Sequence, residues 1–440
     1  MSFFSIKVAA GRKVTLFASI SSLLLSHVHG QFIPEIDATY SSPPKPFSLS
    51  VNPSFIETTR FKVQLGRIAN DLGVAPFTDG VSTEMAATLQ NYWVNEFNWT
   101  SIQEQINKNF TMFTTVVKID DQNYTEPIPL HFVHHRSNRS DAVPLLFLHG
   151  FPGSFLEVGR IISSLTHPPN SSVPAFHVVA PSLPGFGFTP APVHAGLGPI
   201  EVAHAFNALM HQLSYPRYVI QGGDLGSFVL TYQAALHPES VISVLSNLWV
   251  PALTAADIAR FDANETTPGE TAYIRNITAY QRKGAGYLFL QSTQPLMAGH
   301  ALTDSPLGFA LYIFNLMQEL GTFYHWSLSE IITWAMMYVI QGPYPATRTY
   351  KEFRFADQIV GTDSSGPALF VNVPVGVTQR PQDAGWGVPL DWARRIGNVT
   401  ALYVHDFGGH FAAYQTPDTL LDDCWRFWGN KSASGVGKSH

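Results

Sequence analysis

Residues 218–232 read YVIQGGDLGSFVLTY, in which a glycine-flanked aspartate separates two apolar runs. Gly222 and Gly226 lie two residues before and two residues after Asp224, the spacing of a G-x-nucleophile-x-G turn between a strand and a helix. Small residues at both positions let the strand and the helix cross closely. The pattern predicts a strand, a sharp turn that exposes Asp224, and a helix.

Aspartate at this position predicts a different chemistry from that of the more usual serine. A carboxylate nucleophile attacks an sp³ carbon that bears a leaving group, and it forms an alkyl ester with the enzyme instead of an acyl-enzyme. The expected reactions are the opening of an epoxide ring or the displacement of a halide. Because Gly-Asp pairs are common in turns, this interpretation needs support from other motifs.

A second apolar run, Val143–Leu148, is typical of a buried parallel strand and ends in the loop HGFPGS at 149–154. This loop can supply a backbone donor to the site. We expect the N–H groups of Phe151 and Leu225 to hold the oxyanion that forms on Asp224 when water attacks the ester. The Phe151–Pro152 bond is a candidate cis peptide.

The predicted general base is His410, which follows two glycines and a predicted strand at 399–404. The order along the chain supports it, because in this class of fold the nucleophile comes first, the acid second and the histidine last. The chain has 17 histidines, so position and order carry the assignment of His410.

The acid that should orient His410 and stabilise its imidazolium is predicted to be Asp383. It lies in a polar loop after the predicted strand 368–374. Two competitors remain: Asp406 is very close to His410 along the chain, and Asp391 belongs to the following predicted helix.

Four motifs together resemble the epoxide hydrolases of the α/β-hydrolase superfamily, in particular the microsomal-type branch that includes fungal members. They are HGFPGS at 149–154, PSLPGFGF at 181–188, GGDLGS at 222–227 and GGHFAA at 408–413, and the resemblance spans about 47–428. It implies conversion of a hydrophobic epoxide and water to a vicinal diol, without a cofactor. Phe151 and Leu225 stand where members of the family carry tryptophan, but both contribute backbone donors.

The resemblance also implies two tyrosines that project from a cap and give a proton to the epoxide oxygen. The segment GAGY at 284–287 indicates Tyr287, and the segment TYKE at 349–352 indicates Tyr350. Tyr273, Tyr280 and Tyr344 are alternatives, because most of the 16 tyrosines are expected to fill apolar space.

The predicted fold class is α/β: an α/β-hydrolase fold with a mostly parallel sheet flanked by helices, a helical cap and an N-terminal meander. The expected organisation is a signal peptide at 1–30, a linker at 31–45, the meander at 46–125 with a mainly helical pattern, the core at 126–250 and 351–430, the cap at 251–350 and a disordered tail at 431–440.

The composition limits the ligands and partners that this protein is expected to bind. A net charge of −6 without any basic run argues against nucleic acid. The single cysteine, Cys424, excludes an intramolecular disulfide and a cysteine zinc site, and His134 and His135 should point to opposite faces of a strand, so no metal site is expected. The oligomeric state stays open, with a homodimer as one possible assembly.

Secretion is expected from both the N-terminus and the sequons. Basic residues precede an apolar run, Val14–Ser26, that is short for a membrane span, so we expect cleavage near Gly30 and no stable span, with an uncleaved anchor as the alternative. Nine N-x-Ser/Thr sequons predict N-glycosylation, and Asn398, beside a core strand, is the expected exception; the asparagines are 98, 109, 123, 138, 170, 264, 276, 398 and 430.

Two rival functions fit the sequence less well than epoxide hydrolysis. A haloalkane dehalogenase also uses an aspartate nucleophile, but it needs halide-binding donors, commonly indole N–H groups, and Leu225 lacks one. A hydrolase-fold protein that only binds its ligand would commonly have lost the nucleophile or the base, whereas Asp224, Asp383 and His410 are all present.

Overall fold

The computed structural model describes residues 33–354 and 369–437. The expected signal peptide and its cleavage site at Gly30 lie outside these residues. In the described ranges no helix combines the length and the apolar character that crossing a bilayer requires.

A nine-stranded sheet forms the centre of the fold, in the order β1-β2-β3-β5-β4-β6-β7-β8-β9. The pairs from β5 to β9 are parallel, and the pairs that join β1, β2, β3 and β5 are antiparallel. The mostly parallel sheet of an α/β-hydrolase fold is therefore confirmed. The strands are β1 Lys45–Phe47, β2 Met112–Val117, β3 Ile128–His135, β4 Val143–Leu148, β5 Phe176–Pro181, β6 Tyr218–Gly222, β7 Val241–Ser246, β8 Val371–Gln379 and β9 Gly397–Val404.

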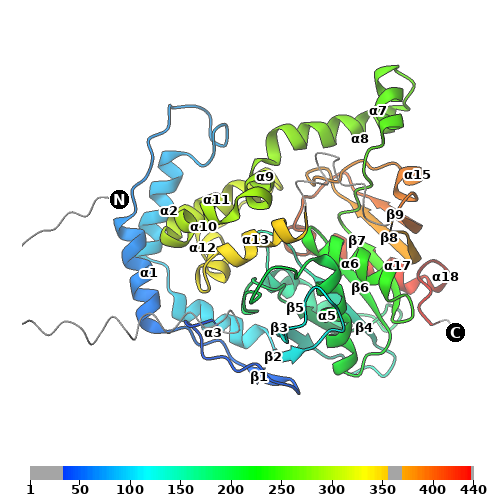
Figure 1. The fold of residues 1–440 in the computed structure, drawn as a ribbon, viewed down its shortest axis with the longest axis horizontal. Coiled ribbons are helices and arrows are strands. Elements are labelled where there is room, and N and C mark those ends of the chain that lie inside the picture. Colours follow the sequence, from blue (N-terminus) through cyan, green and yellow to red (C-terminus); the bar gives the residue numbers. More distant parts are fainter. Residues whose placement is uncertain (1–32, 355–368, 438–440) are drawn as a thin grey trace, which may run out of the picture.

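Helices cover the sheet because its central strands are apolar on both faces. Helix α6 packs on β4, β6, β7 and β8 and lies beside α5 (Figure 1). The core helices are η1 Phe155–Arg160, α4 Ile162–Thr166, α5 Pro199–Gln212, α6 Leu225–Leu236, α15 Leu390–Ala393, α16 Ala412–Gln415, α17 Pro417–Gly429 and α18 Lys431–Ser434.

The segment between β7 and β8 is helical throughout its described part and forms the cap. Its elements are α7 Ala255–Asp262, α8 Pro268–Ala279, η2 Tyr280–Gly284, α9 Gly286–Thr293, α10 Pro295–Asp304, α11 Pro306–Glu319, α12 Leu328–Val339 and α13 Tyr344–Glu352. Ser327 begins α12 with a capping box to Glu330, and prolines stand at the start of α10, α11 and α13.

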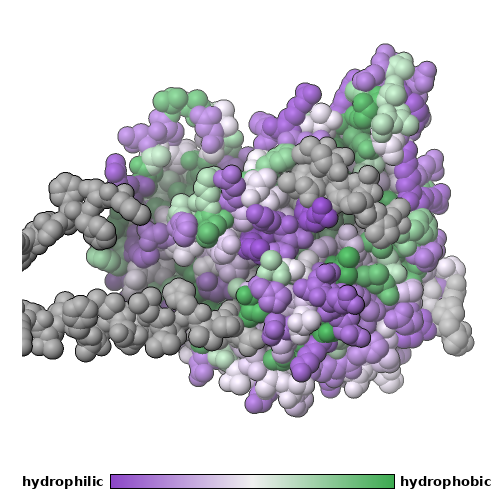
Figure 2. Space-filling model, in the orientation of Figure 1, coloured by the Kyte–Doolittle hydropathy of each residue, from purple (hydrophilic) through white to green (hydrophobic). Residues whose placement is uncertain are grey.

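The N-terminal segment forms α1 Pro53–Leu65, α2 Thr83–Asn95 and α3 Trp99–Asn109. Helix α1 contacts α11 and α2 contacts α12, so this segment braces the cap (Figure 1). Figure 2 shows a largely hydrophilic face, with hydrophobic residues at the tip of the loop between α1 and α2, where Leu72 and Val74 are exposed.

Three details differ from the expectations. Strands β1 and β2 lie in the segment that we expected to be helical. The strand expected at 368–374 runs over Val371–Gln379, and residue 368 lies outside the described part of the chain. The tail expected to be disordered from 431 instead forms α18, with Ser434 buried.

Candidate active site

Asp224 occupies a strained turn between β6 and α6. Its backbone has φ 49° and ψ −130°, a region that residues other than glycine rarely adopt. The turn must be tight, because a Cβ on Gly226 would lie 2.5 Å from the carbonyl oxygen of Leu148. Such strain persists only where the surrounding structure imposes it, and it often accompanies function. The turn presents the Asp224 carboxyl group above the end of β6.

The loop after β4 meets this carboxyl group. The N–H of Phe151 donates to Oδ1 of Asp224 at 2.7 Å. A side chain on Gly150 would collide with Asp224, since its Cβ would lie 2.3 Å from Oδ1, and the Phe151–Pro152 bond is cis. Leu225 is the first residue of α6, so its N–H is one of those that a helix leaves without an intrahelical partner.

His410 lies between two carboxylates. Its Nε2 is 3.3 Å from Oδ2 of Asp224, and its Nδ1 is 2.7 Å from Oδ1 of Asp383. The backbone N–H of His410 donates to the carbonyl of Leu320, which ties the loop after β9 to the cap. The competing acids are elsewhere: Asp406 is exposed, and Asp391 is in the first turn of α15.

The charges around His410 determine its protonation. Burial alone would lower the pKa of His410, but the carboxylates of Asp383 and Asp224 outweigh burial and raise it well above its ordinary value. The resting site therefore holds an imidazolium between two carboxylates. Loss of the charge on Asp224 would lower the pKa of His410 and favour the neutral imidazole.

Tyr287 on α9 and Tyr350 on α13 lie together above this group. Their rings meet edge to face with centroids 5.8 Å apart, and both contact the ring of Phe151. Burial raises the pKa of each phenol well above 10.0, and the negative charge of Asp224 raises it further. Both hydroxyls thus remain protonated close to a carboxylate.

The three alternative tyrosines lie in three different places. The hydroxyl of Tyr280 lies 3.2 Å from that of Tyr287, so Tyr280 is a neighbour of the pair. Tyr273 is buried on the cap helix α8, with its hydroxyl 3.5 Å from the carbonyl of Pro251. Tyr344 packs against Gly299.

Two buried residues near the site were missed in the sequence. The Tyr338 hydroxyl donates to the carbonyl of Gly153, and Glu157 lies at the start of η1 with its carboxyl group against Gly153. Glu157 follows Gly153 by four residues, and this spacing was the only sign in the sequence that the two residues could meet. Among the described residues no group of three or more metal-binding side chains occurs.

A cavity of about 520 Å³ reaches Tyr287 from the surface. Its walls come from the cap and from the loop before α2, and most of its lining residues are uncharged, whereas Asp79, Lys283 and Glu319 are charged. The lining also includes Val81, Leu290, Leu302, Leu311, Tyr312 and Leu316.

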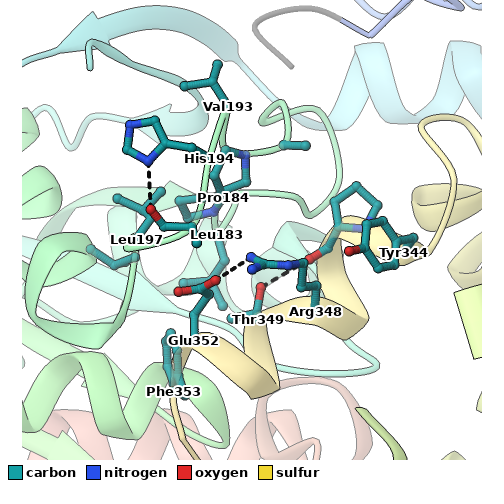
Figure 3. A pocket seen from close by; sticks show the side chains of 15 residues that line it. Leu183, Pro184, Val193, His194, Leu197, Tyr344, Arg348, Thr349, Glu352 and Phe353 are labelled. Atoms are coloured by element: carbon teal, nitrogen blue, oxygen red, sulfur yellow. Dashed lines mark hydrogen bonds and ion pairs between the residues drawn. The ribbon is translucent and has the colours of Figure 1, made fainter. Parts of the chain in front are cut away.

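A separate cavity of about 310 Å³ lies beside α13 (Figure 3). Arg348 and Glu352, which form an ion pair, line it together with Pro184 and Phe353, whereas Tyr350 of the same helix does not. Helix α13 therefore separates this cavity from the predicted catalytic residues.

Comparison with known proteins agrees with the geometry. The family model described as "Epoxide hydrolase N terminus" matches residues 44–158, and the model "alpha/beta hydrolase fold" matches residues 143–297. Epoxide hydrolase 1 of Sus scrofa is 28% identical, with 88% of each chain covered.

Two solved structures are also similar. The epoxide hydrolase of Aspergillus niger has a TM-score of 0.72 at 26% identity and covers 90% of this chain and 97% of its own. The juvenile hormone epoxide hydrolase of the silkworm Bombyx mori has a TM-score of 0.77 at 25% identity, with 89% and 94% covered.

An α/β-hydrolase domain preceded by an epoxide hydrolase N-terminal segment defines the class of this protein. The chain belongs to the microsomal-type epoxide hydrolases, and it is an enzyme of that family.

Proposed function

We propose that the enzyme converts a hydrophobic epoxide to a vicinal diol through an ester with Asp224. The observation that carries this proposal is the chain of contacts from Asp383 through His410 to Asp224, which faces the two tyrosines. A nucleophile, a base with its orienting acid, and two neutral phenols are the groups that the reaction needs.

In the first step Oδ2 of Asp224 attacks one ring carbon of the epoxide and the carbon–oxygen bond on the opposite side breaks. Oδ1 is the oxygen bound by the Phe151 N–H, so Oδ2 is the oxygen left to attack. Tyr287 and Tyr350 hydrogen-bond the leaving oxygen, and one of them supplies its proton. His410 loses its proton as Asp224 becomes a neutral ester, and that proton restores the tyrosine through solvent.

In the second step neutral His410 takes a proton from water, and the water oxygen attacks Cγ of Asp224. The N–H groups of Phe151 and Leu225 stabilise the negative charge that develops on Oδ1. The tetrahedral intermediate collapses, the ester bond to the alkyl oxygen breaks, and that oxygen takes the proton from His410. The diol leaves, and the new carboxylic acid of Asp224 gives its proton to His410, which restores the carboxylate and the imidazolium of the resting site.

The cavity that reaches Tyr287 supports an apolar substrate. Leucine side chains and Tyr312 line it, and against them a hydrocarbon group would be removed from water. Some relatives are named juvenile hormone epoxide hydrolases, and for this chain a lipid-like or terpenoid epoxide fits the apolar side chains of the cavity.

The experiment that tests this function is diol formation from a small panel of epoxides. We expect Asp224→Ala to abolish it, and Tyr287→Phe and Tyr350→Phe each to slow it, with the double variant inactive. Tyr273→Phe is the matched control, because its hydroxyl lies at Pro251, away from the site. Full diol formation by Asp224→Ala would contradict the proposal.

We also propose that the chain enters the secretory pathway and carries N-linked glycans. All nine sequon asparagines are exposed, Asn398 included, so the expected exception has no basis in burial. Enzymatic removal of N-glycans from the protein secreted by a eukaryotic host should lower its mass, and an unchanged mass would contradict glycosylation.

A further inference from the structure

Glu157 is a buried carboxylic acid with no part in the mechanism above. It follows the loop that carries Phe151, and Ser154 caps the short helix η1 in which it lies. Its side chain turns back onto the loop, because a Cβ added to Gly153 would lie 1.7 Å from its Oε1. Only 9% of Glu157 is exposed, so its carboxyl group is part of the interior of the site.

The Oε1 atom of Glu157 has no hydrogen-bond partner among residues 33–354 and 369–437, although it is out of contact with solvent. A buried acceptor without a partner costs about 1–3 kcal/mol, so such atoms in native proteins usually serve a bound water or a function. No lysine or arginine pairs with Glu157 in the described residues, so it is not one half of a structural ion pair.

The charges of the catalytic site act on Glu157. Burial raises its pKa to about 8, the charge of His410 lowers it and the charge of Asp224 raises it, and backbone groups of Gly150 and Ser154 lower it. Burial and the charge of Glu157 raise the pKa of Tyr338, whose hydroxyl donates to the carbonyl of Gly153. One loop thus contacts both carboxyl groups, Asp224 at Gly150 and Glu157 at Gly153.

We propose that Glu157 is a positioning residue that accepts a hydrogen bond from the hydrolytic water through Oε1. This inference rests on the proposed covalent mechanism and concerns its second step. A water that donates one hydrogen to Nε2 of His410 and the other to Oε1 of Glu157 has a lone pair left to point at Cγ of Asp224.

The step balances without any further reactant. His410 takes one proton, the water oxygen bonds to Cγ of Asp224, and the bond to the alkyl oxygen breaks as that oxygen takes the proton from His410. Glu157 keeps its hydrogen bond throughout and neither gains nor loses a proton.

A role confined to stability would slow both chemical steps or neither, whereas a positioning role slows only hydrolysis. The test is therefore a rapid-mixing experiment with an epoxide substrate, quenched with acid and read as the intact mass of the protein. The mass separates free enzyme from alkyl-enzyme, so the rates of ester formation and ester hydrolysis are measured separately.

Glu157→Gln keeps the shape of the side chain and a carbonyl oxygen in the place of Oε1, so we expect both of its rates to stay close to those of wild type. Glu157→Ala removes the acceptor; we expect it to form the ester at the wild-type rate and to hydrolyse it about 10- to 100-fold more slowly, since misplacing a reactant commonly costs up to about 100-fold. Added formate should restore part of the hydrolysis rate of Glu157→Ala. Glu201→Ala is the matched control: Glu201 is also buried, but it bonds Gly198 and Asn123.

Three outcomes would overturn the inference. Equal slowing of both steps in Glu157→Ala would indicate a structural role, and unchanged hydrolysis in Glu157→Ala would indicate none. If the wild-type enzyme forms no alkyl-enzyme, the covalent mechanism is wrong. The proposed role of Glu157 is then wrong as well. The wild-type reaction thus distinguishes the two failures.

Discussion

At the scale of residues, the site depends on one carboxylate that is held in a strained turn and neutralised by one histidine. Asp224 has a positive φ, and its two oxygens have different partners, the Phe151 N–H and His410. In the proposed mechanism, this difference gives the oxygens their roles: Oδ2 attacks, and Oδ1 later carries the negative charge.

Replacement of His410 should separate the two chemical steps. In His410→Gln the nucleophile and both tyrosines remain, so ester formation continues, whereas hydrolysis loses its base and slows about 100- to 10,000-fold. Intact mass spectrometry after one substrate addition should show stable alkyl-enzyme. Asp383→Asn should give a weaker form of the same result, and diol release without ester accumulation in His410→Gln would contradict the assignment.

Glu157 should make stability depend on pH. Its pKa is raised from 4.5 to about 8 in the folded protein, so between these values the folded chain holds a proton that the unfolded chain has lost. The free energy of unfolding therefore falls as pH rises through this window, by on the order of a few kcal/mol.

Urea unfolding of wild type and Glu157→Gln at pH 5 and pH 9 measures this contribution as the difference between their free energies of unfolding. The contributions of groups common to both proteins, including His410, Asp224 and Tyr338, largely cancel in this difference. The variant should gain stability relative to wild type at pH 9. The same difference between the two proteins at both pH values would refute the raised pKa.

Single residues were predictable from the sequence where glycines restrict the backbone around them. Asp224, Phe151 and His410 each adjoin a glycine pair or a glycine-bounded loop, and the structure brings these three together. Glu157 and Tyr338 have no such local mark. Their importance arises from side chains that meet across the loop at Gly153, which linear spacing does not encode.

At the scale of elements, helix α12 links the cap to the core. Glu330 closes the capping box at Ser327 and also accepts hydrogen bonds from Arg160 of η1, Tyr324 and Tyr414. Arg160 lies over the ring of Tyr414 with 3.8 Å to its centroid. This cluster connects the cap to the two core segments that carry Glu157 and His410.

Glu330→Ala should lower the free energy of unfolding by about 1–3 kcal/mol, because it removes a helix cap and a half-buried ion pair. Glu330→Gln should cost less, since glutamine can still close the capping box. Thermal or urea unfolding of both variants measures the difference. An alanine variant as stable as wild type would show that the cap is held by other contacts.

Element boundaries were least predictable where pairing is nonlocal. Strand β8 continues past Pro374, where we expected an end, because the register with β9 shifts between Val371 and Val375 and a proline is tolerated at such an irregularity. Strands β1 and β2 were missed because their partners lie far away: β1 pairs with β2, and β2 pairs with β3. Short segments become strands through such pairing more than through their own propensity.

At the scale of the whole molecule, the cavity proposed for the substrate is built from the N-terminal segment as well as the cap. Val81 comes from the loop before α2, whereas Tyr287 and Leu311 come from α9 and α11. The sequence predicted both segments, but not which side chains would meet, because that depends on how α1 and α2 pack on α11 and α12.

Val81→Trp should narrow this cavity without touching Asp224 or His410. We expect kcat/KM for a bulky apolar epoxide to fall by about 10-fold or more while that for a small epoxide changes little, since pocket contacts of this size are commonly worth about 1–3 kcal/mol. Steady-state kinetics on the two substrates, with Val74→Trp on the exposed loop as control, measures the ratio. Equal loss for both substrates would contradict this route of entry.

The central claim is that Asp224 bonds covalently to the substrate, and a single-turnover reaction in ¹⁸O-water tests it most directly. With enzyme in excess, the first diol should carry no ¹⁸O, and mass spectrometry of the peptide that contains Asp224 should show one ¹⁸O in its carboxyl group. A labelled first diol with an unlabelled Asp224 would mean that water opens the epoxide directly, and the covalent mechanism would be wrong.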